Sequence, residues 1–507
     1  MTVASGGTLY LAGFNQTVAG LTNTGLVNMG TSTSPGTVLT TANYVGQGGA
    51  IAMNTFLGAD GSRSDRLVIN GGAATGNSFL RIANAGGAGA LTTGNGILLI
   101  DTTNGGTTAA GAFGLGNRTV AGPYEYTLFR SSIDASNPQA WYLRSTLDCT
   151  LAPNASVCAQ PSIPPTSPSA PPTPPTVPHY RAETSLYATL PSMVLQYGRN
   201  LMDTLHERIG EERPSVAPAD GNNPQPSLGW ARIITLSGSQ FGSSDGILSK
   251  GPQYNYGIDA FQGGIDLYRA ERADGGSDHA GIYTAIGQMS ANVTHLTGLP
   301  AGSNTLKAYT LGGYWTRFSA TGWYLDAVTQ YTWNDLKAAP LGISGLTTQG
   351  GSFAASLETG KPFQLGAGYS IEPQAQLIYQ TASLAGSADS AASVAFNDVD
   401  SLAGRLGARF ARSFAIDPGA VQPHLITAWV RPSVWYEFLG NPTTSFSSAT
   451  GFIPFRSDLG GSWGEIAAGF DVQVARNTSF YTNLNYQIGF NGRSDAYGGK
   501  FGARVAW

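Results

Sequence analysis

Apolar and polar residues alternate along the second half of the chain, and the alternation is clearest in the last segment. The apolar face of this segment carries Tyr497, Phe501, Val505 and Trp507. Lys500 and Arg504 fall on the opposite face, and residues 323–333, 369–379 and 480–490 repeat the pattern. Because successive side chains of a strand point to opposite sides, each segment predicts a strand with one apolar, aromatic face.

The predicted strands are about ten residues or longer, above the usual five or six of soluble sheets. Their aromatic residues gather near the strand ends, as in the girdles of a lipid-facing barrel. Such a sheet must close, because lipid cannot satisfy an open edge. We therefore expect a twelve-stranded antiparallel transmembrane β-barrel over residues 225–507. Its strands are expected to start near Leu228, Tyr254, Ala280, Thr305, Gly322, Gly350, Leu365, Leu402, Val421, Trp463, Thr478 and Tyr497.

Charged residues on the predicted strands are expected to face the lumen, because charge is disfavoured against lipid. These residues are Asp266, Asp326, Glu372, Glu465, Asp471, Lys500 and Arg504. Solvating a wet lumen is the simpler role for any one of them than performing chemistry.

Residues 1–158 have a different pattern, in which short apolar segments are separated by Gly, Asn and Asp. Their irregular spacing predicts the coils of a right-handed parallel β-helix, in which each coil depends on its neighbours. A β-sandwich is the alternative. Residues 110–148 are richer in aromatics, and we expect them to cap the last coil.

Residues 159–179 are rich in proline, which favours an extended, semi-rigid linker. Residues 180–213 then show a helical period. The apolar positions include Leu186, Leu190 and Tyr197, and the polar ones include Asn200, Asp203 and Arg208. We expect one continuous helix over 191–212, about 30 Å long. Its charges exclude lipid contact, which favours a place in a water-filled pore over an ordinary interdomain helix.

The composition adds exclusions. No apolar run approaches the roughly 18 residues of a transmembrane helix. The net charge of −4 offers no basic surface for nucleic acid. No basic and apolar leader precedes the first segment, so the sequence is expected to lack a signal peptide. Cys149 and Cys158 are close together, which favours a small disulfide over two free thiols.

No catalytic, metal or cofactor motif is found. The five histidines are scattered without the spacing of metal ligands, and none precedes the proline-rich linker. We expect no cofactor and no enzymatic activity.

These segments, in this order, resemble the type Va autotransporter family. The run FGLGNRTVAGPYEYTLFR is similar to the pertactin-like autochaperone region at the end of an exported passenger. The proline-rich linker, the helix that begins YRAE and the barrel resemble the family's translocator, and the terminal FGARVAW is similar to its last strand.

The resemblance implies a barrel in the Gram-negative outer membrane that exports its own passenger to the cell surface. The strand carrying Tyr497, Phe501, Val505 and Trp507 would be the signal that the barrel-assembly machinery reads. Further implied partners are periplasmic chaperones, outer-membrane lipid and lipopolysaccharide, and host or cell-surface ligands of an adhesive passenger. We expect a monomer. The alternatives are a porin-like solute channel and the translocator of an enzyme encoded upstream.

Overall fold

The computed structural model describes residues 1–30, 34–147, 177–211, 228–242, 251–416, 424–475 and 477–507. They form two compact units. The first contains residues 1–184 with 388–394 and 445–454, and the second contains the remaining residues. The expected Cys149–Cys158 disulfide lies outside the described residues, as does the linker before Val177.

Parallel strands build most of the first unit. β3 (Gln16–Asn23) pairs with β5 (Val38–Thr55), which pairs with β6 (Arg66–Asn70) and β7 (Ala73–Asn84). β6 also pairs with β8 (Ile97–Thr103). The shorter parallel strands are β1 (Thr2–Val3), β2 (Thr8–Tyr10), β4 (Leu26–Asn28), β9 (Thr107–Thr108) and β10 (Phe113–Leu115). Parallel pairing is the strand direction of the predicted coil, and the right-handed β-helix itself stays a prediction.

The strand direction changes at the end of the first unit. β11 (Thr119–Ala121), β12 (Tyr124–Arg130) and β13 (Trp141–Arg144) are antiparallel, and β13 also runs antiparallel to β8. The ring of Trp141 is buried and packs edge-on against the ring of Phe113, with the ring centres 5.6 Å apart. These three strands therefore cover apolar side chains at the end of the stack, and we call them the cap.

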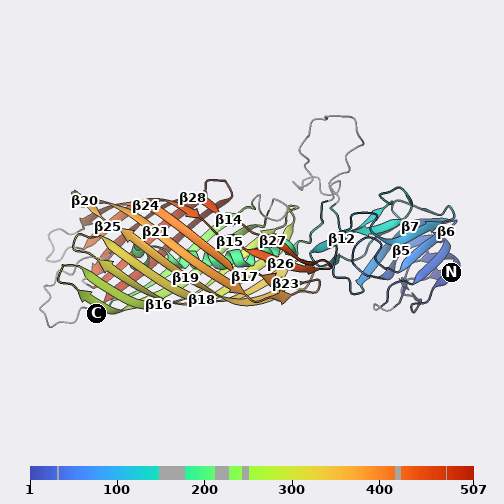
Figure 1. Ribbon diagram of the computed structural model, residues 1–507, viewed down its shortest axis with the longest axis horizontal. Coiled ribbons are helices and arrows are strands. Elements are labelled where there is room, and N and C mark those ends of the chain that lie inside the picture. The colour runs from blue at the N-terminus through green and yellow to red at the C-terminus, as the bar shows by residue number, and fades with distance from the viewer. Residues whose placement is uncertain (31–33, 148–176, 212–227, 243–250, 417–423, 476) are drawn as a thin grey trace, which may run out of the picture. The chain divides into compact units, whose positions relative to one another are not determined.

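The second unit is dominated by antiparallel strands that pair in order around a closed barrel (Figure 1). Its long strands are β14 (Leu228–Gln240), β15 (Gln253–Glu271), β16 (Ser277–Thr294), β17 (Pro300–Phe318), β18 (Tyr324–Pro340), β19 (Leu346–Gly360), β21 (Tyr369–Leu384), β24 (Val399–Ala415), β25 (Leu425–Glu437), β28 (Gly461–Ala475), β29 (Thr478–Gly489) and β30 (Ser494–Ala506). β14 pairs with β30 from Leu228↔Ala506 to Gln240↔Ser494, which closes the sheet. Among the described residues this is the predicted twelve-stranded barrel.

The remaining strands are short. β20 (Phe363–Gly366) pairs with β21. β22 (Ser387–Ala388), β23 (Ser393–Phe396), β26 (Thr443–Ser448) and β27 (Gly451–Arg456) form a separate four-stranded sheet in that order.

The two faces of the barrel wall differ in polarity. Large apolar side chains such as Phe261, Leu406 and Leu484 are exposed on the outside. On the last strand Tyr497, Phe501 and Trp507 are also exposed. The buried positions of the same strands carry many polar and charged side chains, as in a barrel with a polar interior.

Within the described residues, no helix has the length and apolar character needed to cross a membrane.

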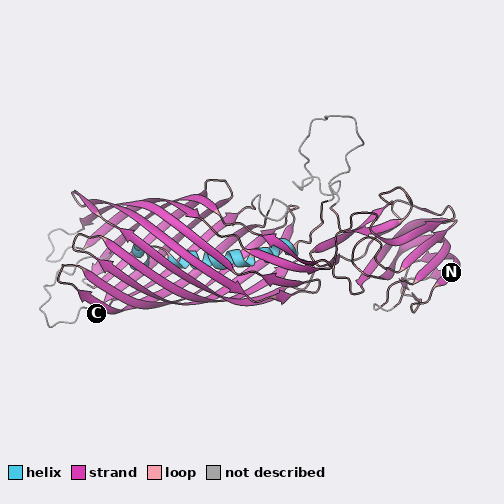
Figure 2. Cartoon of the chain, in the orientation of Figure 1, coloured by secondary structure: helices cyan, strands magenta, loops and turns pink. Residues whose placement is uncertain are grey.

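The predicted continuous helix over 191–212 is wrong. The segment forms three short helices, which Figure 2 shows among the barrel strands: α1 (Glu183–Ala188), α2 (Leu190–Met202) and α3 (Leu205–Ile209). Asp203 has a φ of 55° and a ψ of −157°, which lie outside the helical region, so α2 ends there. Thr204 is extended, and its side chain accepts a hydrogen bond from the Glu207 amide as the N-cap of α3.

Candidate functional site

The helical segment is packed against the barrel wall on more than one side. Its apolar positions are buried, but so are most of its polar ones. Gly198 of α2 comes so close to the wall that a Cβ there would lie 2.4 Å from Oε1 of Gln380. Gln330, from another strand, donates a hydrogen bond to the Gly198 carbonyl at 3.1 Å. The segment is therefore seated among the strands along this stretch.

Acidic groups of the helical segment meet basic groups of the wall. Oδ2 of Asp203 lies 2.7 Å from Nη1 of Arg232 and 2.6 Å from Nζ of Lys500. Oε2 of Glu207 lies 2.9 Å from Nη2 of Arg431. These side chains are buried or nearly so, and a buried charge is tolerated when it is paired and hydrogen-bonded.

Basic groups of the helical segment meet acidic groups of the wall in the same way. Arg208 donates two hydrogen bonds to Asp326, at 2.8 and 3.0 Å. The His206 ring lies 2.9 Å from Glu372. Two parallel hydrogen bonds fix the orientation of the guanidinium as well as its position. The charge pattern of the segment is therefore complementary to that of the lumen.

The wall also satisfies the backbone groups freed by the break between α2 and α3. Gln376 donates to the carbonyl of Asp203 at 2.6 Å, and Arg232 donates to that of Leu201 at 3.0 Å. Glu358 accepts a hydrogen bond from the Leu205 amide at 2.9 Å. Helix ends leave such groups without intrahelical partners, so side chains from the wall stabilise the break.

Most of the seven charged residues expected in the lumen lie close to the helical segment. Asp326, Glu372 and Lys500 pair with it directly, and Asp471 accepts a hydrogen bond from the Glu211 amide at 3.1 Å. The remaining three have contacts on the wall. Their partners are Arg431 for Glu465, Tyr314 for Asp266 and Ser479 for Arg504.

The basic wall residues that receive the acidic side chains were not predicted. Arg232, Arg405 and Arg431 are among the most completely buried large side chains of the chain. Arg405 lies 3.1 Å from Glu358. The alternation of the strands could have identified these arginines as lumen-facing, because each one lies on a predicted strand next to an outward-facing apolar residue. In β24, for example, Leu406 is exposed beside the buried Arg405.

The expected pore-helix residues have different neighbours. Leu186, Leu190 and Tyr197 are buried. The Asn200 side chain donates to the Gln196 carbonyl within the same helix at 2.8 Å. Asp203 and Arg208 hold the ion pairs described above.

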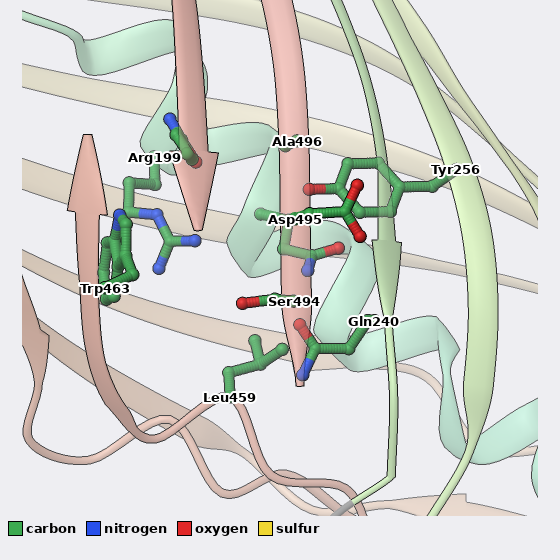
Figure 3. A pocket seen from close by; sticks show the side chains of 10 residues that line it. Arg199, Gln240, Tyr256, Leu459, Trp463, Ser494, Asp495 and Ala496 are labelled. Atoms are coloured by element: carbon green, nitrogen blue, oxygen red, sulfur yellow. The ribbon is translucent and has the colours of Figure 1, made fainter. Parts of the chain in front are cut away.

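A small polar cavity remains beside α2, as Figure 3 shows. Arg199 enters it from the helix and stacks over the ring of Trp463, 4.7 Å from the ring centre. Tyr256 and Asp495 line it from the wall. Its volume of about 40 Å³ is enough for about three water molecules. The helical segment therefore leaves little open space at this level of the lumen.

The described residues hold no cluster of side chains suited to a metal ion. The chemistry available at this site is electrostatic, because its charged groups are paired with one another. The arrangement can hold a peptide segment inside a barrel.

Two family models match the chain. The autotransporter β-domain matches residues 229–485, about half of the chain, and the autochaperone domain type 1 matches residues 17–128.

Several curated proteins are similar over nearly the whole chain. The adhesin BmaC autotransporter of Brucella suis is 28% identical, with 93% of this chain and 14% of the relative covered. The autotransporter adhesin AIDA-I of Escherichia coli is 26% identical, with 94% and 34% covered. Pertactin of Bordetella bronchiseptica is 30% identical over 42% of this chain and 24% of its own. The chain thus spans between 14% and 34% of the length of these relatives.

Solved structures with a similar fold include the transport unit of AIDA-I from Escherichia coli. It is 17% identical and has a TM-score of 0.49, with 65% of this chain and all of that chain covered. The β domain of the Bordetella autotransporter BrkA is 21% identical and has a TM-score of 0.41, with 55% and 99% covered.

Proposed function

Because this chain belongs to the autotransporter family, we propose that its barrel exports the N-terminal residues 1–158 and holds them at the cell surface for adhesion. The barrel is an outer-membrane translocator, and the exported part of such a chain lies at the cell surface. The observation that carries the proposal is the charge-complementary helical segment, because it places the chain between residues 185 and 211 inside the lumen of the barrel.

Adhesion is proposed from the names of relatives. Both BmaC and AIDA-I are named adhesins, and both align with nearly all of this chain. In this proposal the exported part acts by binding a host or cell-surface ligand rather than by catalysis. The barrel acts as a monomer, surrounded by outer-membrane lipid and lipopolysaccharide. Periplasmic chaperones and the barrel-assembly machinery deliver it, and the machinery reads the strand that ends at Trp507.

Protease shaving of intact cells tests the export step. One epitope tag is placed before Thr2 and a second after Pro178, on either side of residues 148–176. Extracellular protease is expected to remove the first tag while the barrel stays intact. A first tag that stays protected until the cells are lysed would contradict export.

A conductance measurement separates the translocator from a porin-like channel. In planar bilayers the purified chain is expected to conduct poorly, because the helical segment occupies the lumen. Deleting residues 185–211 is expected to raise the conductance of single barrels several-fold. The charge-neutral variant Asn200→Gln, which leaves the segment in place, is the control. Equal conductance of the deletion and the parent would favour an open channel.

A further inference from the structure

The chain continues beyond the cap to Leu147, and the described residues resume at Val177. The Leu147 amide donates to the Val177 carbonyl at 2.8 Å, so the two ends of the intervening 29 residues are hydrogen-bonded to each other. Both ends belong to the first unit, which includes residues up to Thr184. We call residues 177–184 the strap.

The strap pairs with two segments of the first unit through its backbone. His179 donates to the Ser145 carbonyl at 2.8 Å and accepts from the Glu125 amide at 2.9 Å. Arg181 donates to the Pro123 carbonyl at 2.9 Å. Antiparallel bridges join Thr146 to Pro178 and Tyr124 to Tyr180. The strap therefore runs antiparallel to these two segments through isolated bridges.

Side chains reinforce this pairing. Arg118 donates two hydrogen bonds to Glu183, at 2.6 and 3.0 Å, and also binds Glu125. The Glu183 side chain is fully buried. The rings of Tyr124 and Tyr180 stack with their centres 5.6 Å apart. Two parallel hydrogen bonds between charged groups give both strength and a fixed register.

Arg181 anchors the end of the strap. Its buried guanidinium donates to the Gly122 carbonyl at 2.7 Å and lies 2.6 Å from Asp389. It also lies over the ring of Phe446. All of these residues belong to the first unit. The strap is therefore held by backbone pairing, by two sets of ion pairs and by aromatic contacts.

We propose that the strap is a non-covalent retention site, which keeps the exported residues 1–147 on the cell after the chain is cut between residues 159 and 176. This rests on the proposed function, because it requires the first unit to be outside the cell. The partner of the cap surface is the strap, which stays joined through the helical segment to the barrel. Two further hydrogen bonds of the first unit, from the Gly122 amide to Ala391 and from the Ala449 amide to Gly89, do not involve the strap, so the variants below are needed to separate its contribution.

The test places a site-specific protease sequence between Pro165 and Thr166 and an epitope tag before Thr2. Intact cells are treated with the protease, and the tag is measured in the cell pellet and in the medium. Cutting is verified by denaturing electrophoresis of the pellet. We expect complete cutting with the tag remaining in the pellet. Complete cutting with the tag in the medium would overturn the retention site and leave export standing. Absence of cutting on intact cells, with cutting after lysis, would overturn the proposed function and the retention site with it.

Variants identify the strap as the cause of retention. Arg118→Ala and Glu183→Ala each remove one partner of an ion pair whose carboxylate is buried and whose guanidinium is partly exposed, and each is expected to release the tag about tenfold faster after cutting. Glu183→Gln, which keeps an acceptor, is expected to have a smaller effect. Arg81→Ala is the matched control, because Arg81 is exposed on β7 in the same unit. Surface display before cutting shows that each variant is folded and exported. If all variants stay bound as firmly as the parent, the strap is not the retention site.

Discussion

Arg208 and Asp326 form an ion pair that is almost completely withdrawn from solvent. Thr316 donates a further hydrogen bond to the same carboxylate at 2.6 Å. A buried pair adds little net stability over a well-packed apolar pair, but removing one partner leaves an uncompensated charge. The pair therefore fixes where the helical segment sits.

Replacing Arg208 with Met is expected to destabilise the protein by about 3–5 kcal/mol, because Asp326 then stays buried without its guanidinium partner. The double variant Arg208→Met with Asp326→Leu is expected to recover most of this loss. The measurement is the temperature at which the barrel loses its fast mobility in electrophoresis, and Lys337→Met on an exposed position is the control. A double variant as unstable as the single one would argue against the ion pair.

His179 in the strap gives the retention site a pH dependence. Burial lowers the pKa of His179. The negative charge of Glu125 raises the pKa and the positive charge of Arg118 lowers it, and the net shift is downward. A docked strap therefore excludes a proton that a free strap takes up below pH about 6.5. Docking is expected to weaken as the pH falls through that value.

The measurement is the release of the cut, tagged segment from cells at pH 7.5 and pH 5.5, with faster release expected at the lower pH. His179→Gln should flatten the dependence. Asp389 does not contribute to the pH dependence of release between pH 5.5 and pH 7.5. Burial alone would raise its pKa, but Arg181 holds the pKa below the ordinary value of an aspartate, so its contribution is lost only in stronger acid. Release that is independent of pH in the parent would contradict the role of His179.

At the scale of elements, the strands were more predictable than the helical segment. Alternation located the starts of β14 and β29 at Leu228 and Thr478, because lipid outside and polar contacts inside impose a period of two on every strand. The helical period continued through Asp203 and could not reveal the break. The partners that stabilise the break, such as Arg232 and Gln376, come from distant strands. Their pairing depends on the closed barrel.

The break itself can be tested with two variants of Asp203. Asp203→Asn keeps a residue type that is enriched at positive φ but removes the charge that Arg232 and Lys500 contact. Asp203→Ala removes both properties, and it is expected to be less stable than Asp203→Asn by about 1 kcal/mol. Thermal unfolding in detergent measures both. Equal stability of the two variants would show that the backbone conformation contributes nothing.

At the scale of the whole molecule, the seam between β14 and β30 turns the sheet into a barrel. Trp507 lies over it, since a Cβ on Gly229 would come 2.8 Å from ring atom Cη2 of Trp507. Trp507, the last residue of the sequence, therefore covers β14, the first strand of the barrel. Closure matters because an open edge in lipid would leave backbone groups without hydrogen-bond partners.

Trp507→Ala is expected to lower the amount of folded barrel in the outer membrane several-fold, because it removes the apolar contact at the seam and the aromatic end of the proposed assembly signal. Trp333→Ala is the matched control, since Trp333 is an exposed tryptophan on β18, away from the seam. Folded protein is quantified by electrophoretic mobility without heating. Equal losses in the two variants would point to lipid contact in general.

The hydrogen bond between Leu147 and Val177 has a practical consequence. Because Leu147 and Val177 are hydrogen-bonded to each other, the number of residues between them does not set the distance between the segments before Leu147 and after Val177. Loop-closure entropy rises slowly, by about 0.6 kcal/mol for each doubling of length. A foreign antigen or reporter domain inserted between these two positions is therefore expected to leave the described framework on either side unaltered.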